Sequence, residues 1–162
     1  MNWFENAVFY HIYPIGYFGC PRQNDFTSEP THKILRVIDD IPHIKELGCN
    51  AVYFGPVFES SAHGYDTADY TKIDRRLGTN EDFKKVCDAL HENGIRVILD
   101  GVFNHVGRDF WAFRDVRENK LGSAKKDWFH VREGNDGYND GFWYEGWEGH
   151  YELVKLNLYN PE

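Results

Sequence analysis

Cysteine and runs of positive charge are scarce in this chain. The three cysteines, Cys20, Cys49 and Cys87, lie far apart and form no C-x-x-C pair. This spacing suggests neither a disulfide framework nor a zinc site, so we expect three buried free thiols. The formal net charge is −8 and no Lys/Arg run occurs, which argues against nucleic acid or an anionic membrane surface as a partner.

Long hydrophobic segments are absent as well. No stretch approaches the roughly 20 apolar residues of a membrane-spanning helix. Residues 1–6 (MNWFEN) lack the basic and apolar regions of a secretory signal peptide. These absences predict a soluble, cytoplasmic protein. Aromatic residues, by contrast, make up 17% of the chain, and such rings either pack in a core or stack on the faces of sugars.

Three apolar runs have the length and composition of β-strands buried on both faces. They are residues 7–15 (AVFYHIYPI), 50–58 (NAVYFGPVF) and 95–103 (IRVILDGVF). Two helical patterns separate them, so the order is strand, helix, strand, helix, strand. This order predicts a parallel sheet with right-handed crossovers and with both helices on one face.

The two helical patterns differ in clarity. Apolar residues recur every three or four positions over residues 34–47, but Pro42 either kinks this helix or opens a shorter one. The second helix begins after Thr79, which caps it together with Asp82, and it ends at Gly94.

After residue 104 the pattern changes to a long excursion rich in Gly, Asp, Asn, Trp and Tyr. Regular apolar repeats are few until residues 151–158 (YELVKLNL), which resemble a strand. Residues 134–141 (GNDGYNDG) look like a calcium loop, but Tyr138 stands where a ligand oxygen should be. We therefore favour ordinary turns in this segment.

Polar residues at the carboxyl ends of parallel strands line the functional sites of α/β folds. That rule selects Tyr65 behind the second strand, and Asp100, Asn104 and His105 at the end of the third. Asp100 is either functional or a structural ion, because a carboxylate at the end of a buried strand needs a partner. Asn104 and His105 suit a hard cation beside a hydroxyl-rich ligand, although a structural role explains each of them better when it is taken alone.

The string DGVFNH at residues 100–105 resembles the first signature of the α-amylase family, where Asp, three residues and Asn-His close the third strand of a (β/α)8 barrel. Residues 10–14 (YHIYP) resemble that family's first strand, and residues 50–58 resemble its second. Residues 64–66 (GYD) resemble the loop whose tyrosine lies under the reacting glucose. The resemblance implies an α/β fold in which residues 1–105 form the first three βα units of a TIM barrel. Residues 106–162 would then form the small domain that the family inserts after its third strand.

The resemblance also implies roles for single residues. Tyr65 and His105 would contact the sugar where cleavage occurs, Asp100 would orient a later arginine, and Asn104 would bind calcium. The segment Lys155-Leu156-Asn157 resembles the signature that closes the inserted domain. Lys155 replaces the aspartate of most α-amylases, which is similar to the cyclomaltodextrinase and neopullulanase branch.

The family's catalytic carboxylates come from its fourth, fifth and seventh strands, so we expect them beyond Glu162. The resemblance thus implies a fragment of a retaining glycoside hydrolase for α-linked glucans (starch, maltooligosaccharides or cyclodextrins). Its partners would be that substrate and the missing carboxy-terminal half of the barrel. Two alternatives remain. One is a non-catalytic carbohydrate-binding or half-barrel scaffold protein. The other is a metal-dependent hydrolase in which His11 and His63 join Asp100, Asn104 and His105 as ligands.

Overall fold

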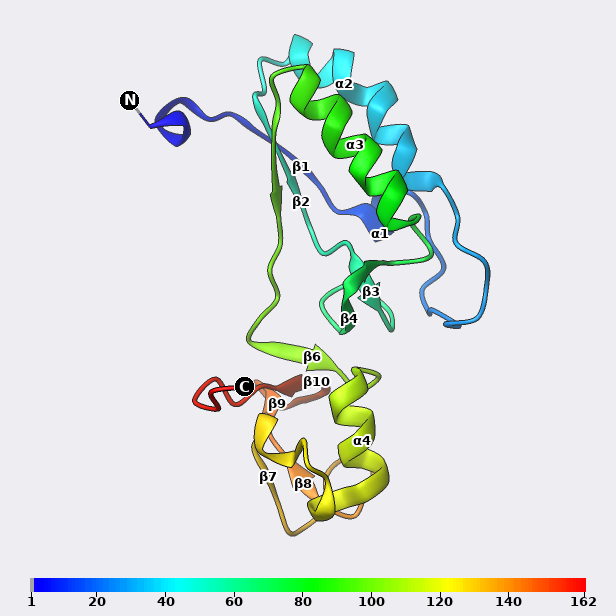
Figure 1. Cartoon of the computed structure of the whole chain (residues 1–162), viewed down its shortest axis with the longest axis vertical. Coiled ribbons are helices and arrows are strands. Elements are labelled where there is room, and N and C mark those ends of the chain that lie inside the picture. Colours follow the sequence, from blue (N-terminus) through cyan, green and yellow to red (C-terminus); the bar gives the residue numbers. More distant parts are fainter. Residues whose placement is uncertain (1) are drawn as a thin grey trace. The chain divides into compact units, whose positions relative to one another are not determined.

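The structure, a computed structural model, describes residues 2–162, which divide into two units (Figure 1). The first unit holds the chain up to Phe58 together with Thr71–Gly101, and the second holds Glu59–Tyr70 and Val102–Glu162. The loop around Tyr65 thus groups with the later part of the chain. The expected division into residues 1–105 and 106–162 concerns the domains of a complete barrel and stays a prediction.

The first unit is built on a parallel sheet. Its strands are β1 (Phe9–Ile12), β2 (Ala51–Phe54) and β5 (Arg96–Leu99), in the order β1-β2-β5. Val52 in the middle strand lies opposite Tyr10 on one side and Val97 on the other. The predicted parallel sheet is confirmed, and its carboxyl ends point the same way, although each strand is shorter than its apolar run.

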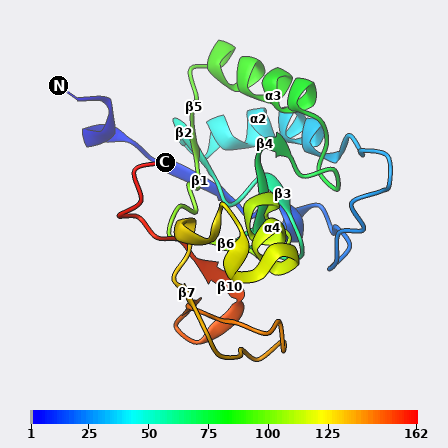
Figure 2. The same ribbon diagram turned by 60° about the horizontal axis from the view of Figure 1, so that its bottom comes forward.

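Burial of the strands differs from the expectation. Only β2 is buried along most of its length, whereas Phe9 of β1 and Leu99 of β5 are exposed. Two causes combine, because β1 and β5 form the edges of the sheet and because the helices of this unit cover only one of its faces (Figure 2). The prediction that all three strands are buried on both faces is therefore wrong for this chain.

The helix α2 (Val37–Glu46) follows a short 3-10 helix at Lys33–Arg36 and runs through Pro42 without starting anew there. Its apolar stripe packs on the sheet through residues such as Ile41 and Ile44. Leu47, which the pattern placed in the same stripe, is exposed because the helix has ended one residue earlier.

The helix α3 (Asn80–Glu92) begins as the sequence predicts. Thr79 Oγ1 accepts a hydrogen bond from Asp82 N (3.1 Å), and Asp82 Oδ2 accepts one from Thr79 N (3.1 Å). This reciprocal pair satisfies two backbone donors that a helix start leaves open. Phe83, Val86 and Leu90 then face the core shared with α2.

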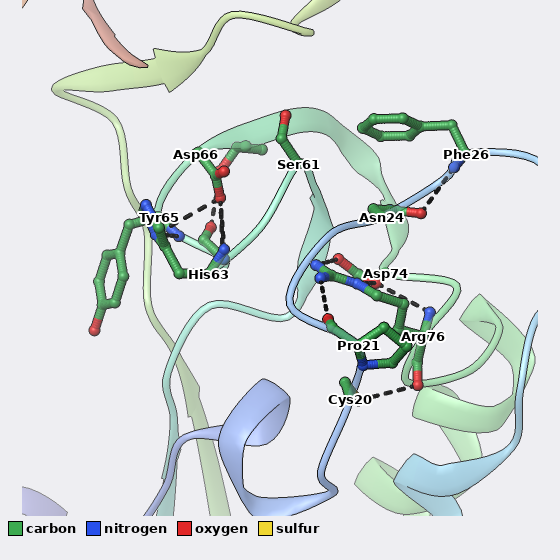
Figure 3. Close-up of polar contacts among 12 residues, drawn as sticks. Cys20, Pro21, Asn24, Phe26, Ser61, His63, Tyr65, Asp66, Asp74 and Arg76 are labelled. Atoms are coloured by element: carbon green, nitrogen blue, oxygen red, sulfur yellow. Dashed lines mark hydrogen bonds and ion pairs between the residues drawn. The ribbon is translucent and has the colours of Figure 1, made fainter. Parts of the chain in front are cut away.

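A buried ion pair holds the turn before α3. Arg76 donates to both carboxylate oxygens of Asp74, at 2.8 and 2.7 Å, and the two side chains are 5% and 0% exposed (Figure 3). Arg76 also donates to Pro21 O (2.9 Å), and its own carbonyl accepts from Thr31 Oγ1 (2.8 Å) and Cys20 Sγ (3.2 Å). The long connection between β1 and α2 is thereby fastened to this turn.

The second unit contains a three-stranded antiparallel sheet and a helix. The strands are β6 (His105–Gly107), β10 (His150–Lys155) and β9 (Gly146–Trp147), in the order β6-β10-β9. Helix α4 (Trp111–Asn119) covers one face, where Val106, Phe113 and Val154 form the centre of a separate core. The sequence had suggested few regular apolar repeats in this region, so helix α4 corrects that expectation. The strand predicted at residues 151–158 is confirmed in β10, which ends at Lys155.

Short elements complete the structure. They are 3-10 helices at Trp3–Asn6, Lys120–Gly122 and Lys126–Trp128, helix α1 (Pro14–Tyr17), and strands β3 (Phe58–Ser60), β4 (Thr67–Ile73), β7 (Val131–Arg132) and β8 (Trp143–Tyr144). In the segment that resembles a calcium loop, Asp136 Oδ1 accepts from Tyr138 N and Asn135 Oδ1 from Gly141 N, as in ordinary turns.

The cysteines are free thiols, as predicted, but they are partly rather than fully buried. Burial raises the pKa of the Cys20 and Cys87 thiols above the ordinary value. Among residues 2–162, no helix has the length and apolar character that crossing a membrane requires.

The Asp74–Arg76 pair generates the first prediction. Asp74→Asn removes the buried carboxylate charge that accepts two hydrogen bonds from Arg76, so we expect the free energy of unfolding to fall by about 3–5 kcal/mol. Urea unfolding followed by circular dichroism measures this loss. The control is Asp88→Asn, which removes the exposed Lys84–Asp88 pair and should leave the unfolding midpoint unchanged. Equal midpoints for the two variants would contradict the role of the buried pair.

Candidate functional site

The loop between β3 and β4 is shaped by one buried carboxylate. Asp66 Oδ1 accepts hydrogen bonds from His63 N and Gly64 N, both at 3.1 Å. These bonds turn the backbone tightly, and Gly64 takes a positive φ of 95° that suits glycine. As a result the ring of Tyr65 projects away from the carboxylate, as Figure 3 shows, and the residue remains 40% exposed.

The same loop lies directly against β6. A Cβ on Gly107 would lie only 2.3 Å from Asp66 O, so the two backbones approach closer than any other residue type would allow. Ser61 Oγ also donates to Asp109 Oδ2 (2.7 Å), and the Tyr70 hydroxyl donates to Val102 O. These contacts bring the loop of Tyr65 and the strand of His105 together within the second unit.

His105 opens β6 and is only 8% exposed. Its Nδ1 lies 3.2 Å from Asn104 Nδ2, so when the amide donates, Nδ1 is the acceptor and Nε2 carries the proton. Nε2 is buried and makes no hydrogen bond of good geometry within residues 2–162. The nearby backbone of Tyr65 acts to raise the pKa of the His105 ring. Burial nevertheless lowers the pKa of His105 below its ordinary value, which favours the neutral imidazole.

The other two predicted site residues are placed less tightly. Asn104 is exposed, and its carbonyl accepts a hydrogen bond from Leu156 N (3.0 Å). Asp100 follows β5 in the first unit, where its N–H donates to Phe54 O (2.9 Å). Since Asp100 and His105 belong to different units, their expected grouping stays a prediction.

Comparison with known proteins decides the family. The family described as "Alpha amylase, catalytic domain" matches residues 31–158. The chain belongs to the α-amylase family. A cyclomaltodextrinase from Bacillus sp. is 42% identical over 144 residues, covering 80% of this chain and 26% of that protein. Neopullulanase 2 from Thermoactinomyces vulgaris is 40% identical over 147 residues, covering 82% and 25%.

A solved structure agrees in fold. The ligand-free cyclic α-maltosyl-(1→6)-maltose hydrolase of Arthrobacter globiformis superimposes with a TM-score of 0.82 at 38% identity, over 98% of this chain and 39% of that one. The names of these relatives confirm the branch that Lys155 indicated. The chain spans about a quarter of the length of the curated relatives that it matches.

Family membership directs attention to acidic residues beside the site. Glu145 Oε1 forms an ion pair with Lys155 Nζ (2.6 Å), and His130 Nε2 lies 4.0 Å from Glu145 Oε2. Glu148 occupies a turn with a positive φ of 48°. The described residues contain no group of three or more His, Cys, Asp or Glu side chains placed to hold a metal ion.

Sequence reasoning missed two features of this site. Gly107 creates the close approach of the backbones, and the signal for it was an isolated glycine inside a strand. Trp147 stacks on the ring of His105, with centroids 5.4 Å apart and an angle of 30°. No local pattern marks this contact, because it depends on how β9 pairs with β10.

The approach at Gly107 generates the second prediction. Gly107→Ala places a methyl group against the backbone of Asp66, so we expect a loss of about 1–3 kcal/mol in the free energy of unfolding. Gly122→Ala is the matched control, since a Cβ there meets nothing within 4 Å. Thermal and urea unfolding of both variants measure the difference. If the Gly107→Ala protein were as stable as the control, the position of β6 would not depend on the close approach between Gly107 and the backbone of Asp66.

Proposed function

We propose that this chain is the amino-terminal part of the catalytic barrel of a retaining glycoside hydrolase that acts on α-linked glucans. In this proposal the second unit supplies part of the substrate cleft, and the closed (β/α)8 barrel needs a carboxy-terminal half as partner. The observation that carries it is the juxtaposition of the Tyr65 loop with His105 through Gly107. Relatives named cyclomaltodextrinase and maltogenic α-amylase support the substrate class.

Each site residue suits a sugar by its chemistry. The exposed ring of Tyr65 offers an apolar face to the C–H face of a glucose unit, and the family resemblance assigns to His105 a hydrogen bond with a hydroxyl of that unit. Asp100 is assigned, by family resemblance alone, the role of orienting an arginine from a later strand.

Calcium at Asn104 is supported by the family resemblance alone. Calcium takes 6–8 oxygen ligands. Asn104 offers two oxygens at most, and its backbone carbonyl already accepts the hydrogen bond from Leu156. We retain the ion only as a proposal for the complete barrel and assign no chemistry to it. The cytoplasmic location likewise stays a prediction.

Binding of a glucan tests the proposal and is the third prediction. Tyr65→Ala combined with His105→Ala should weaken binding of maltotetraose to the chain by about tenfold or more, because stacking and the hydrogen bond are both lost. Isothermal titration calorimetry and ligand-observed NMR measure the millimolar affinity that we expect. Tyr159→Ala with His91→Ala removes the same residue types from exposed positions and serves as the control. Equal affinity of the two double variants would refute the assigned roles.

The fourth prediction concerns activity. Retaining hydrolysis needs two carboxyl groups roughly 5–5.5 Å apart across the sugar. The family's catalytic carboxylates come from later strands, and Glu145 is already paired with Lys155 Nζ (2.6 Å), so we expect no hydrolysis of a chromogenic maltooligosaccharide by the folded 162-residue chain. Turnover that Glu145→Gln or Glu148→Gln abolishes would place the chemistry within this chain and overturn the proposal that the carboxylates lie elsewhere.

A further inference from the structure

Trp147 lies beside His105 of the candidate site. It belongs to β9, and its register partner on β10 is His150. A Cβ on Gly146 would lie 2.5 Å from His150 O, so the two strands are pressed together at this point. The connecting turn has positive φ angles at Glu148 (48°) and Gly149 (86°), as tight hairpin turns do.

The face of the sheet on which Trp147 lies is the face of His105. Lys155 is the register partner of His105, and directly opposed residues of antiparallel strands point to the same face. Their neighbours Val106 and Val154 point to the other face and are fully buried in the core. Since Trp147 stacks on His105 at 5.4 Å, the indole also lies outside that core.

The indole makes two ring contacts and is still partly exposed. Besides His105, it stacks on His150 with a centroid distance of 6.1 Å and an angle of 27°. These two contacts leave Trp147 38% exposed, whereas His105 is only 8% exposed. A tryptophan that served packing alone would gain most from complete burial, because its apolar surface is the largest of any side chain.

We propose that Trp147 is a further sugar-contact residue, which stacks on a glucose unit adjacent to the one at Tyr65 and His105. The ligand is therefore an α-glucan of at least two contiguous units, and the contact with Trp147 forms only when the second unit is present. This inference rests on the proposed function of the site. Stacking suits the purpose because the C–H face of a pyranose is apolar and a rigid ring loses little conformational entropy on binding.

Tryptophan fluorescence tests the contact between the sugar and Trp147 directly, in variants that replace one tryptophan by another aromatic residue. Saturating maltotetraose should change the emission of the wild-type chain, because a sugar stacked on the indole displaces water from it. Trp147→Phe should abolish this change, whereas Trp111→Phe, which alters another exposed tryptophan of the same unit, should retain it. A signal that survives Trp147→Phe, or that is lost in Trp111→Phe instead, overturns the inference.

Affinity as a function of ligand length separates this inference from the proposed function. Trp147→Ala should weaken maltotetraose binding about tenfold while changing glucose binding less than twofold, and Trp147→Phe should recover most of the loss. Circular dichroism confirms that each variant is folded. If maltotetraose binds and depends on Tyr65 and His105 but not on Trp147, only the inference fails. If maltotetraose does not bind the wild-type chain, the proposed function fails, and the inference that rests on it fails with it.

Discussion

The contact between β6 and the loop that precedes β4 is the constraint on which the candidate site depends. Gly107 has no side chain, and this allows the backbone of β6 to approach Asp66 O more closely than a methyl group would permit. Hydrogen bonds from Ser61 to Asp109 and from Tyr70 to Val102 join the same two segments. The backbone approach and these two side-chain hydrogen bonds together hold the neighbourhood of Tyr65 and His105.

The alternation of side chains along β6 and β10 separates stability from recognition. One face of this pair presents Val106 and Val154 to the core beneath α4. The other face presents His105 and Lys155, and the indole of Trp147 lies beside them. Since successive residues of a strand point to opposite faces, a polar site residue can be the neighbour of a core residue without disturbing the packing of the core. This arrangement explains how a short strand serves both purposes.

The sequence predicted the first unit better than the second. The strands of the parallel sheet and the capped start of α3 follow from local periodicity and from the Thr79–Asp82 pair, which are visible in short windows. Helix α4 escaped prediction because its apolar residues fill barely two turns between polar segments. The exposure of Phe9 and Leu99 also escaped prediction, since a continuous apolar run does not reveal whether both faces of a strand are covered.

From sequence alone came the order of strands and helices, the polar residues that follow the strands, and the family that residues 100–105 indicate. These depend on residue identity and on spacing along the chain. Tertiary structure alone decided that His105 lies against Trp147 and that the Tyr65 loop lies against Gly107. The physical reason is that strand register and the closest approach of two backbones are set between segments far apart in the chain, so neither segment specifies them by itself.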